Sequence, residues 1–200
     1  LWGKDTNDGL SPLSPFLTLS KAVTSASKGQ SIVVMSGVYK GVGNCDFEIF
    51  KNLTIVGEST TFFDGESVRR SGWTMNYPYS ITVNGVCFIN GNSNGGDGGA
   101  VYNYNTGNTL IDCTFINNIG VQGGCLYLRE SNASNCTFIS NTGDYGGAVY
   151  VDDDGNLTSD PGKNFYGLAY KKSGSWEYVS EKDLNDALKS AIDTTPGARA

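Results

Sequence analysis

The chain has 200 residues, and its 38% hydrophobic and 12% aromatic content is enough to fill the narrow core of one elongated domain. The formal net charge is −6, and Lys and Arg cluster only as the pairs Arg69-Arg70 and Lys171-Lys172, which argues against nucleic acid or an anionic membrane as the partner. No run of about eighteen apolar residues is present, so the sequence predicts no membrane span in this fragment.

Residues 1–29 predict an N-terminal loop followed by a short helix. The loop contains Asp5 and Asp8, and whether these carboxylates bind calcium is open from the sequence. Apolar residues at helical spacing between Leu19 and Ala26 predict the helix. The chain shows no signal peptide and begins within a motif, so we expect a mature or excised fragment of a longer protein.

Residues 30–158 contain short β-branched and aromatic runs separated by Asn and Gly, the pattern of an all-β repeat. Apolar, β-branched runs at 31–35 and 53–57 are predicted to begin the first two coils. Residues 60–80 then break the repeat period, which resumes with the run at 80–83. Insertions of this kind map to loops on one face, often the binding face. The candidate ligand-contact residues in this insertion are Arg69, Arg70, Trp73, Tyr77 and Tyr79. The alternative is that its aromatic side chains pack the loop onto the flank of the domain.

The stretch from Leu110 to Val151 contains one pattern twice, at a fixed offset of 23 residues. Cys-Thr-Phe-Ile at 113–116 returns at 136–139, and a Gly-Gly pair follows each copy, beginning at Gly123 and Gly146. A period of this length without a helical pattern predicts a right-handed parallel β-helix of roughly five coils. Leucine-rich repeats have a similar period but need leucines at fixed offsets, and those leucines are missing.

Equivalent residues of successive coils lie about 4.8 Å apart and therefore form ladders. The predicted core ladders are Phe115 on Phe138, Ile116 on Ile139 and Tyr127 on Tyr150. Each Gly-Gly pair belongs at a tight corner, where positive φ and a close backbone approach exclude a Cβ. Asn118 and Asn141 belong at the preceding turn, where Asn tolerates the left-handed conformation and its amide bonds the Asn one coil away.

Cys113 and Cys136 occupy the same repeat position, so we expect them to face inward, side by side and reduced. Their spacing of about 4.8 Å exceeds the mean Cβ–Cβ distance of about 3.8 Å in a disulfide. A role as small buried hydrophobes is favoured over a redox role. Five cysteines without a Cys-x-x-Cys motif and without any His predict no zinc site.

Two motifs alternate through residues 83–151: Phe-x-x-Asn, at 115–118 and 138–141, and Gly-Gly-Ala-Val, at 98–101 and 146–149. The repeat resembles that of the polymorphic outer-membrane proteins and of archaeal adhesin-like proteins, which belong to the pectate-lyase-like β-helix superfamily. The copy of the Gly-Gly-Ala-Val motif at 123–126 departs from this pattern, because Cys125 replaces Ala. A small buried position can hold either residue. The resemblance implies a cell-surface or secreted, adhesin-like module.

The N-terminal segment resembles the entry segment of many extracellular β-helix proteins, in which an Asp/Asn/Gly loop leads to Pro-Phe-x-Thr-Leu and a short helix. These features lie at Gly3–Gly9 and Pro15–Leu19 here. Because the terminal strand of a parallel stack has an exposed edge that would template aggregation, we expect the helix to cap this end.

Residues 159–200 predict a hairpin over 165–179 and a helix from Ser180, which either cap the solenoid or begin a neighbouring domain. Before them, the acidic loop from Asp152 to Asp160 offers oxygen ligands for calcium. Its glycine lies at the wrong place for an EF-hand and no bidentate Glu follows at the twelfth position, so a solvated turn is favoured and no cofactor is expected.

The superfamily also contains polysaccharide lyases and inverting glycosidases, so an enzyme is the alternative hypothesis. A lyase needs an Arg or Lys base beside carboxylate-bound calcium, and inverting hydrolysis needs two carboxylates about 6.5–9.5 Å apart. Among the charged residues compared at the repeat offset, only Arg129 faces a charged partner, Asp152, and an exposed ion pair explains that pairing.

The favoured function is therefore a non-catalytic, adhesin-like module that binds glycan or protein on a cell or host surface. The alternative is a carbohydrate-active lyase or hydrolase that acts on acidic polysaccharide.

Overall fold

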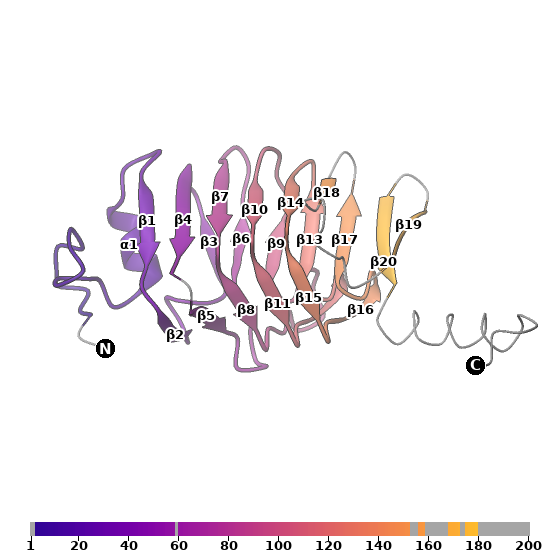
Figure 1. The fold of residues 1–200 in the computed structure, drawn as a ribbon, viewed down its shortest axis with the longest axis horizontal. Coiled ribbons are helices and arrows are strands. Elements are labelled where there is room, and N and C mark those ends of the chain that lie inside the picture. The colour runs from indigo at the N-terminus through magenta and orange to yellow at the C-terminus, as the bar shows by residue number, and fades with distance from the viewer. Residues whose placement is uncertain (1–2, 59, 153–155, 159–167, 173–174, 180–200) are drawn as a thin grey trace, which may run out of the picture.

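Short parallel strands wind into a β-solenoid of about five turns, which confirms the predicted mostly-β fold with one short helix (Figure 1). The computed structural model describes residues 3–58, 60–152, 156–158, 168–172 and 175–179. Each turn contributes strands to three sheets, and the apolar side chains between these sheets form the core.

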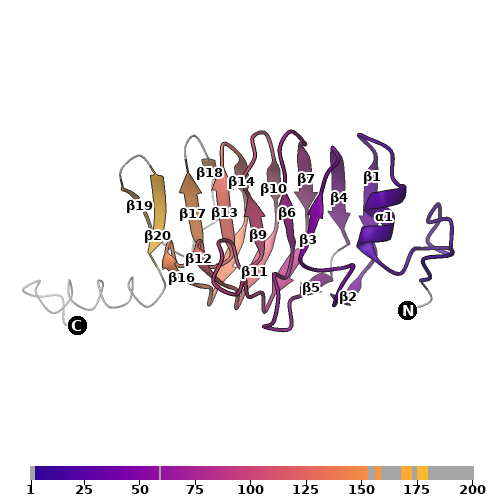
Figure 2. The ribbon, with the colours of Figure 1, turned by 180° about the vertical axis from the view of Figure 1, so that it is seen from behind.

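The three sheets run side by side along the solenoid (Figures 1 and 2). The six-stranded sheet contains β1 (Ser31–Val34), β4 (Leu53–Gly57), β7 (Ile81–Asn84), β10 (Thr109–Ile111), β14 (Asn132–Ser134) and β18 (Asn156–Thr158). The five-stranded sheet contains β2 (Gly37–Lys40), β5 (Thr61–Asp64), β8 (Cys87–Ile89), β11 (Thr114–Ile116) and β15 (Thr137–Ile139).

The seven-stranded sheet contains β3 (Phe47–Ile49), β6 (Trp73–Met75), β9 (Val101–Asn103), β13 (Leu126–Arg129), β17 (Val149–Asp152), β20 (Ser175–Val179) and β19 (Leu168–Lys172). A small parallel pair, β12 (Ile119–Gln122) and β16 (Thr142–Tyr145), joins the last two sheets in the later turns. Strands of this length suit a solenoid, because each one needs to pack only one inward face.

The helix α1 (Leu19–Ser25) lies against the first turn at the N-terminal end (Figure 1). Thr18 is its N-cap and accepts a hydrogen bond from the Lys21 amide, and Leu19 and Val23 are buried. Lys51 lies at the other end of the helix, where its ammonium group donates to the carbonyls of Val23, Thr24 and Ala26 at 2.8–3.0 Å. The helix is thereby fastened to the loop before β4. None of the helices among the described residues has the length and apolarity to cross a membrane.

A column of aromatic rings fills the core beneath the five-stranded sheet. Tyr39, Phe63, Phe88, Phe115 and Phe138 occupy the inward position of successive strands, with ring centroids 5.1–6.1 Å apart. The register pairs Phe115 with Phe138 and Ile116 with Ile139. The expectation that the Ile pair forms a core ladder was wrong, because strand alternation buries the Phe pair and leaves Ile139 43% exposed on the outer face. Stacked rings at these distances bury large apolar area and add a favourable offset-stacking term.

Residues 60–80 are not an insertion, so that prediction was wrong. Thr61–Asp64 forms β5 and Trp73–Met75 forms β6, both in the regular sheets. The connections that follow the third strand are longer in the second and third turns (76–80 and 104–108) than in the fourth turn (130–131), and Leu53 pairs with Ile81, an offset of 28 residues. Longer connections therefore increase the sequence offset between paired strands, while the strands themselves stay paired in register.

Asn118 and Asn141 form a buried ladder. The Asn118 side-chain amide donates to the Asn141 side-chain oxygen at 3.0 Å, and the Asn141 amide donates to the Phe115 carbonyl at 2.9 Å. The expectation that these two residues adopt the left-handed conformation was wrong. The residues with positive φ are their predecessors, Asn117 at 55° and Ser140 at 52°. The left-handed residue bends the chain at the corner between two sheets, and the Asn that follows it is buried in the core.

The C-terminal described strands, β19 and β20, form an antiparallel hairpin, and β20 pairs antiparallel with β17. The hairpin predicted over 165–179 is thus present in the backbone and extends the seven-stranded sheet. The predicted helix from Ser180 lies outside the described residues, as do residues 153–155 and 159–160 of the acidic loop.

Candidate binding surface

The structure separates the five residues that the sequence suggested for ligand contact. Trp73 is 0% exposed, and its indole nitrogen donates to the Asn44 carbonyl at 2.9 Å. Its ring packs edge-on against Phe63 and Phe88, at 5.0 and 5.3 Å. The assignment of Trp73 as a contact residue was therefore wrong, because an inward position of β6 hides the ring from any ligand.

Arg69 and Arg70 lie in the connection from β5 to β6, where the neighbouring backbone holds Arg70. Its guanidinium donates to the carbonyls of Asp97 and Gly98 at 3.0–3.3 Å and lies 3.4 Å from an Asp46 carboxylate oxygen. Arg69 is 3.9 Å from Glu66. Arg70 thus links the connection from β5 to β6 with the corresponding connections of the first and third turns, at the opposite end of β6 from the tyrosines.

Tyr77 and Tyr79 follow β6 in the connection to β7, and Tyr77 is 74% exposed. The Tyr79 ring meets Phe50 of the preceding turn edge-on at 6.4 Å. Asn105, in the corresponding connection of the next turn, donates through its side-chain amide to the Tyr79 carbonyl. Phe50 and the two tyrosines therefore lie in equivalent connections of the first and second turns of the solenoid.

A tyrosine ladder lies on the outer face of the seven-stranded sheet, which is in front in Figure 2. Tyr102, Tyr127 and Tyr150 are paired in register, with centroids 5.0 and 5.5 Å apart. The expectation that Tyr127 and Tyr150 form a core ladder was wrong. Strand alternation buries their neighbours Val149 and Val151, and so places Tyr150 on the outside.

Polar groups flank this ladder. The Tyr127 hydroxyl donates to an Asp152 carboxylate oxygen at 2.7 Å, and burial together with this bond raises the pKa of Tyr127. Tyr104 stacks on Tyr102 at 6.0 Å, and the Arg129 guanidinium lies 4.5 Å from the Tyr104 ring centroid. Tyr127 is only 5% exposed because these neighbours cover it, whereas Tyr104 is 49% exposed.

We call these residues the aromatic strip. It consists of Phe50, Tyr77, Tyr79, Tyr102, Tyr104, Tyr127 and Tyr150. Its members come from all five turns: Tyr102, Tyr127 and Tyr150 lie on the outer face of the seven-stranded sheet, and the others lie in the connections that follow the strands of that sheet. The sequence contained a signal for part of it: each Gly-Gly repeat ends in Tyr, and apolar residues or Asn on both sides of that Tyr fix its outward direction.

Several carboxylates away from the strip, in the N-terminal loop and on the coils, are bonded to nearby donors. Asp5 accepts from the Thr18 hydroxyl and two backbone amides at 2.9–3.0 Å, and Asp8 accepts from the Leu10 amide at 3.0 Å. Asp64 pairs with Lys40 at 2.8 Å, and the register places Arg129 opposite Asp152. Within the described ranges, no group of three His, Cys, Asp or Glu residues is arranged to hold a metal ion.

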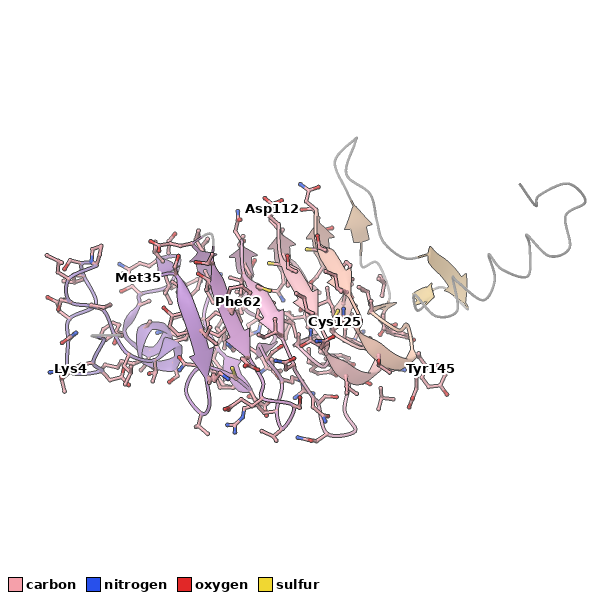
Figure 3. The ribbon with its side chains drawn as sticks, turned by 60° about the horizontal axis from the view of Figure 1, so that its bottom comes forward. Lys4, Met35, Phe62, Asp112, Cys125 and Tyr145 are labelled. Atoms are coloured by element: carbon pink, nitrogen blue, oxygen red, sulfur yellow. The ribbon has the colours of Figure 1, made fainter. Side chains whose placement is uncertain are left out.

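Cys113 and Cys136 are free cysteines that face the core next to each other, and Cys125, in the ribbon interior of Figure 3, is buried as well. Burial raises the pKa of the Cys45 thiol to about 12 and that of Cys87 to about 11, and it raises that of Cys113 well above its ordinary range. Because the thiolate is the reactive form, these raised pKa values keep the thiols protonated and slow to react near neutral pH.

Alkylation with iodoacetamide should therefore be slow in the native protein at about pH 8 and complete in denaturant. The hydrogen bond with Cys113 lowers the pKa of Cys136, but the Cys136 side chain is buried and so shielded from the reagent. Mass spectrometry should then count all five cysteines as modified. As pH rises towards 11, the half-buried Cys87 should react first in the native state. Fewer than five modified cysteines after denaturation, with a bridge mapped to Cys113 and Cys136, would contradict the reduced pair.

Fold and surface together define a parallel β-solenoid repeat protein with an aromatic strip along one sheet. Comparison of the chain with protein-family models, with curated proteins and with solved structures gave no match. Its relation to the adhesin-like and pectate-lyase-like proteins therefore stays a prediction from the repeat motifs.

Proposed function

We propose that this protein is a non-catalytic, adhesin-like module, secreted or displayed on a cell surface, that binds glycan through the aromatic strip. The observation that carries the proposal is the strip itself: aromatic side chains from every turn lie on the strands of one sheet or in the connections that follow them, and three of them, Phe50, Tyr77 and Tyr104, are about half exposed or more. Contiguous exposed apolar surface on a soluble fold marks an interaction site.

The chemistry of the strip suits sugar better than an apolar protein partner. A tyrosine supplies a rigid ring for the C–H face of a sugar and a hydroxyl for its polar groups, at a low cost in conformational entropy. Arg129 and Asp152 add charged hydrogen-bonding groups beside the rings. The solenoid holds these groups in place before a ligand arrives, which lowers the entropic cost of binding.

Tyr104 tests the proposal, because Tyr145, which is labelled in Figure 3, is equally exposed, at 49%, but lies on β16, outside the seven-stranded sheet. A glycan that the wild type selects on an array should bind Tyr104→Ala about tenfold more weakly, a loss of about 1.4 kcal/mol. Tyr145→Ala should bind within about twofold of the wild type, and both variants should melt near the wild-type temperature.

Two results would count against the proposal. Equal losses in Tyr104→Ala and Tyr145→Ala would show that the strip is not the binding surface. Release of unsaturated or shortened sugars from the bound glycan would show turnover and would favour the lyase or hydrolase alternative.

A further inference from the structure

The aromatic strip has a direction. Tyr102, Tyr127 and Tyr150 lie at equivalent positions of three successive turns, so the ladder runs parallel to the solenoid axis at about 4.8 Å per turn. Tyr104 follows Asn103 and Arg129 follows Leu128, and those two strand residues are themselves paired, so a second row lies beside the first. A ligand that contacts successive members of either row must extend along the axis.

The charge on the strip is balanced locally. Arg70, which lies 5.7 Å from the Tyr102 ring centroid, is 3.4 Å from Asp46, and Arg129 is 3.9 Å from Glu130. Asp152 adds a further carboxylate at the end of the ladder. Together with the net charge of −6, this arrangement offers no excess of positive potential to an acidic polymer.

The two ends of the strip differ in character. Phe50, Tyr77 and Tyr79 form an aromatic end over the first two turns, where Glu48 and Thr74 are the outward residues of the neighbouring strands β3 and β6. Arg129 and Asp152 make the other end polar. Between them, Tyr104 is the most exposed ring of the third turn, so a ligand would stack there and form hydrogen bonds further along the ladder.

We infer that the ligand is an uncharged, linear glycan that lies along the solenoid axis and reaches at least from Tyr104 to Tyr150. This inference rests on the proposed function and adds the class and the direction of the glycan. Affinity should then rise with chain length until the ladder is spanned, because each further sugar contacts the next turn. Salt should have little effect, since no net charge is neutralised on binding.

Calorimetry with defined oligosaccharides tests both parts. The neutral probes are cello-, manno- and N-acetylchito-oligosaccharides from dimer to hexamer, and the acidic probe is oligogalacturonate of the same lengths. At least one neutral series should gain about tenfold or more in affinity from dimer to hexamer. That affinity should change less than about twofold between about 0.05 and about 0.5 M sodium chloride, and oligogalacturonate should bind about tenfold more weakly.

Variants at the far end of the ladder test the direction. In Tyr150→Ala the neutral hexamer should lose most of its gain over the dimer, while the dimer keeps its wild-type affinity. Tyr150→Leu, which retains bulk over the sheet, serves as a second variant if the alanine variant melts early. A length gain that survives in both would overturn placement along the axis.

The outcomes separate this inference from the function on which it rests. Tightest binding of oligogalacturonate, weakened by salt and by Tyr104→Ala, would overturn the neutral glycan and leave the strip as a binding surface. Failure of every series to bind at the strip would overturn the proposed function and the inference with it.

Discussion

Phe115→Ala should lower the free energy of unfolding by about 3–5 kcal/mol. The Phe115 ring is fully buried and stacks between Phe88 and Phe138, with centroids 5.2 and 5.3 Å away. Its removal leaves a cavity that both adjacent turns share, because each turn of a solenoid is stabilised mainly by its neighbours. Urea unfolding followed by circular dichroism measures the change.

Phe50→Ala is the matched control, because the Phe50 side chain is 55% exposed. It should cost less than about 1 kcal/mol. Trp73→Ala should resemble Phe115→Ala rather than the control, since Trp73 is buried against the same column of rings. A loss for Phe115→Ala no larger than that for Phe50→Ala would contradict a shared aromatic core.

Gly124→Ala should be comparably harmful, with a cost of about 3 kcal/mol or more. A Cβ on Gly124 would lie 2.1 Å from the Gly147 carbonyl oxygen of the next turn and 2.5–2.6 Å from the Thr142 carbonyl group. All of these neighbours are backbone atoms, so the turns would have to separate. The left-handed residue of the pair is the preceding one, Gly123 at 71°, so close approach alone accounts for the expected loss at Gly124.

Gly96→Ala controls for the general effect of adding a methyl group to a glycine. A Cβ there would meet the flexible end of Arg70 at 3.1 Å and a Ser93 carbonyl oxygen at 3.4 Å, which the loop can accommodate. Its melting temperature should fall by only a few degrees. If Gly124→Ala melts as high as Gly96→Ala, the corner is looser than these contacts require.

Trp73 and Tyr77 show why the residue type alone does not predict whether a side chain is buried. Trp73 and Tyr77 lie four positions apart in one segment of the sequence, and both are large aromatics. The inward parity of β6 buries Trp73, whereas the connection after β6 exposes Tyr77. The sequence could suggest aromatic contact residues there, but the separation of the two depends on where the strand begins and ends.

The repeat at an offset of 23 residues was enough to predict the parallel solenoid and the pairing of Phe115 with Phe138, and the strand pattern of residues 165–179 separately predicted the hairpin, because each follows from local spacing. The regular strands within residues 60–80 and the outward-facing tyrosine ladder became apparent only in the folded chain. Both outcomes depend on stacking: a turn can lengthen its connections without losing register, and packing against neighbouring turns selects which face of each strand is buried.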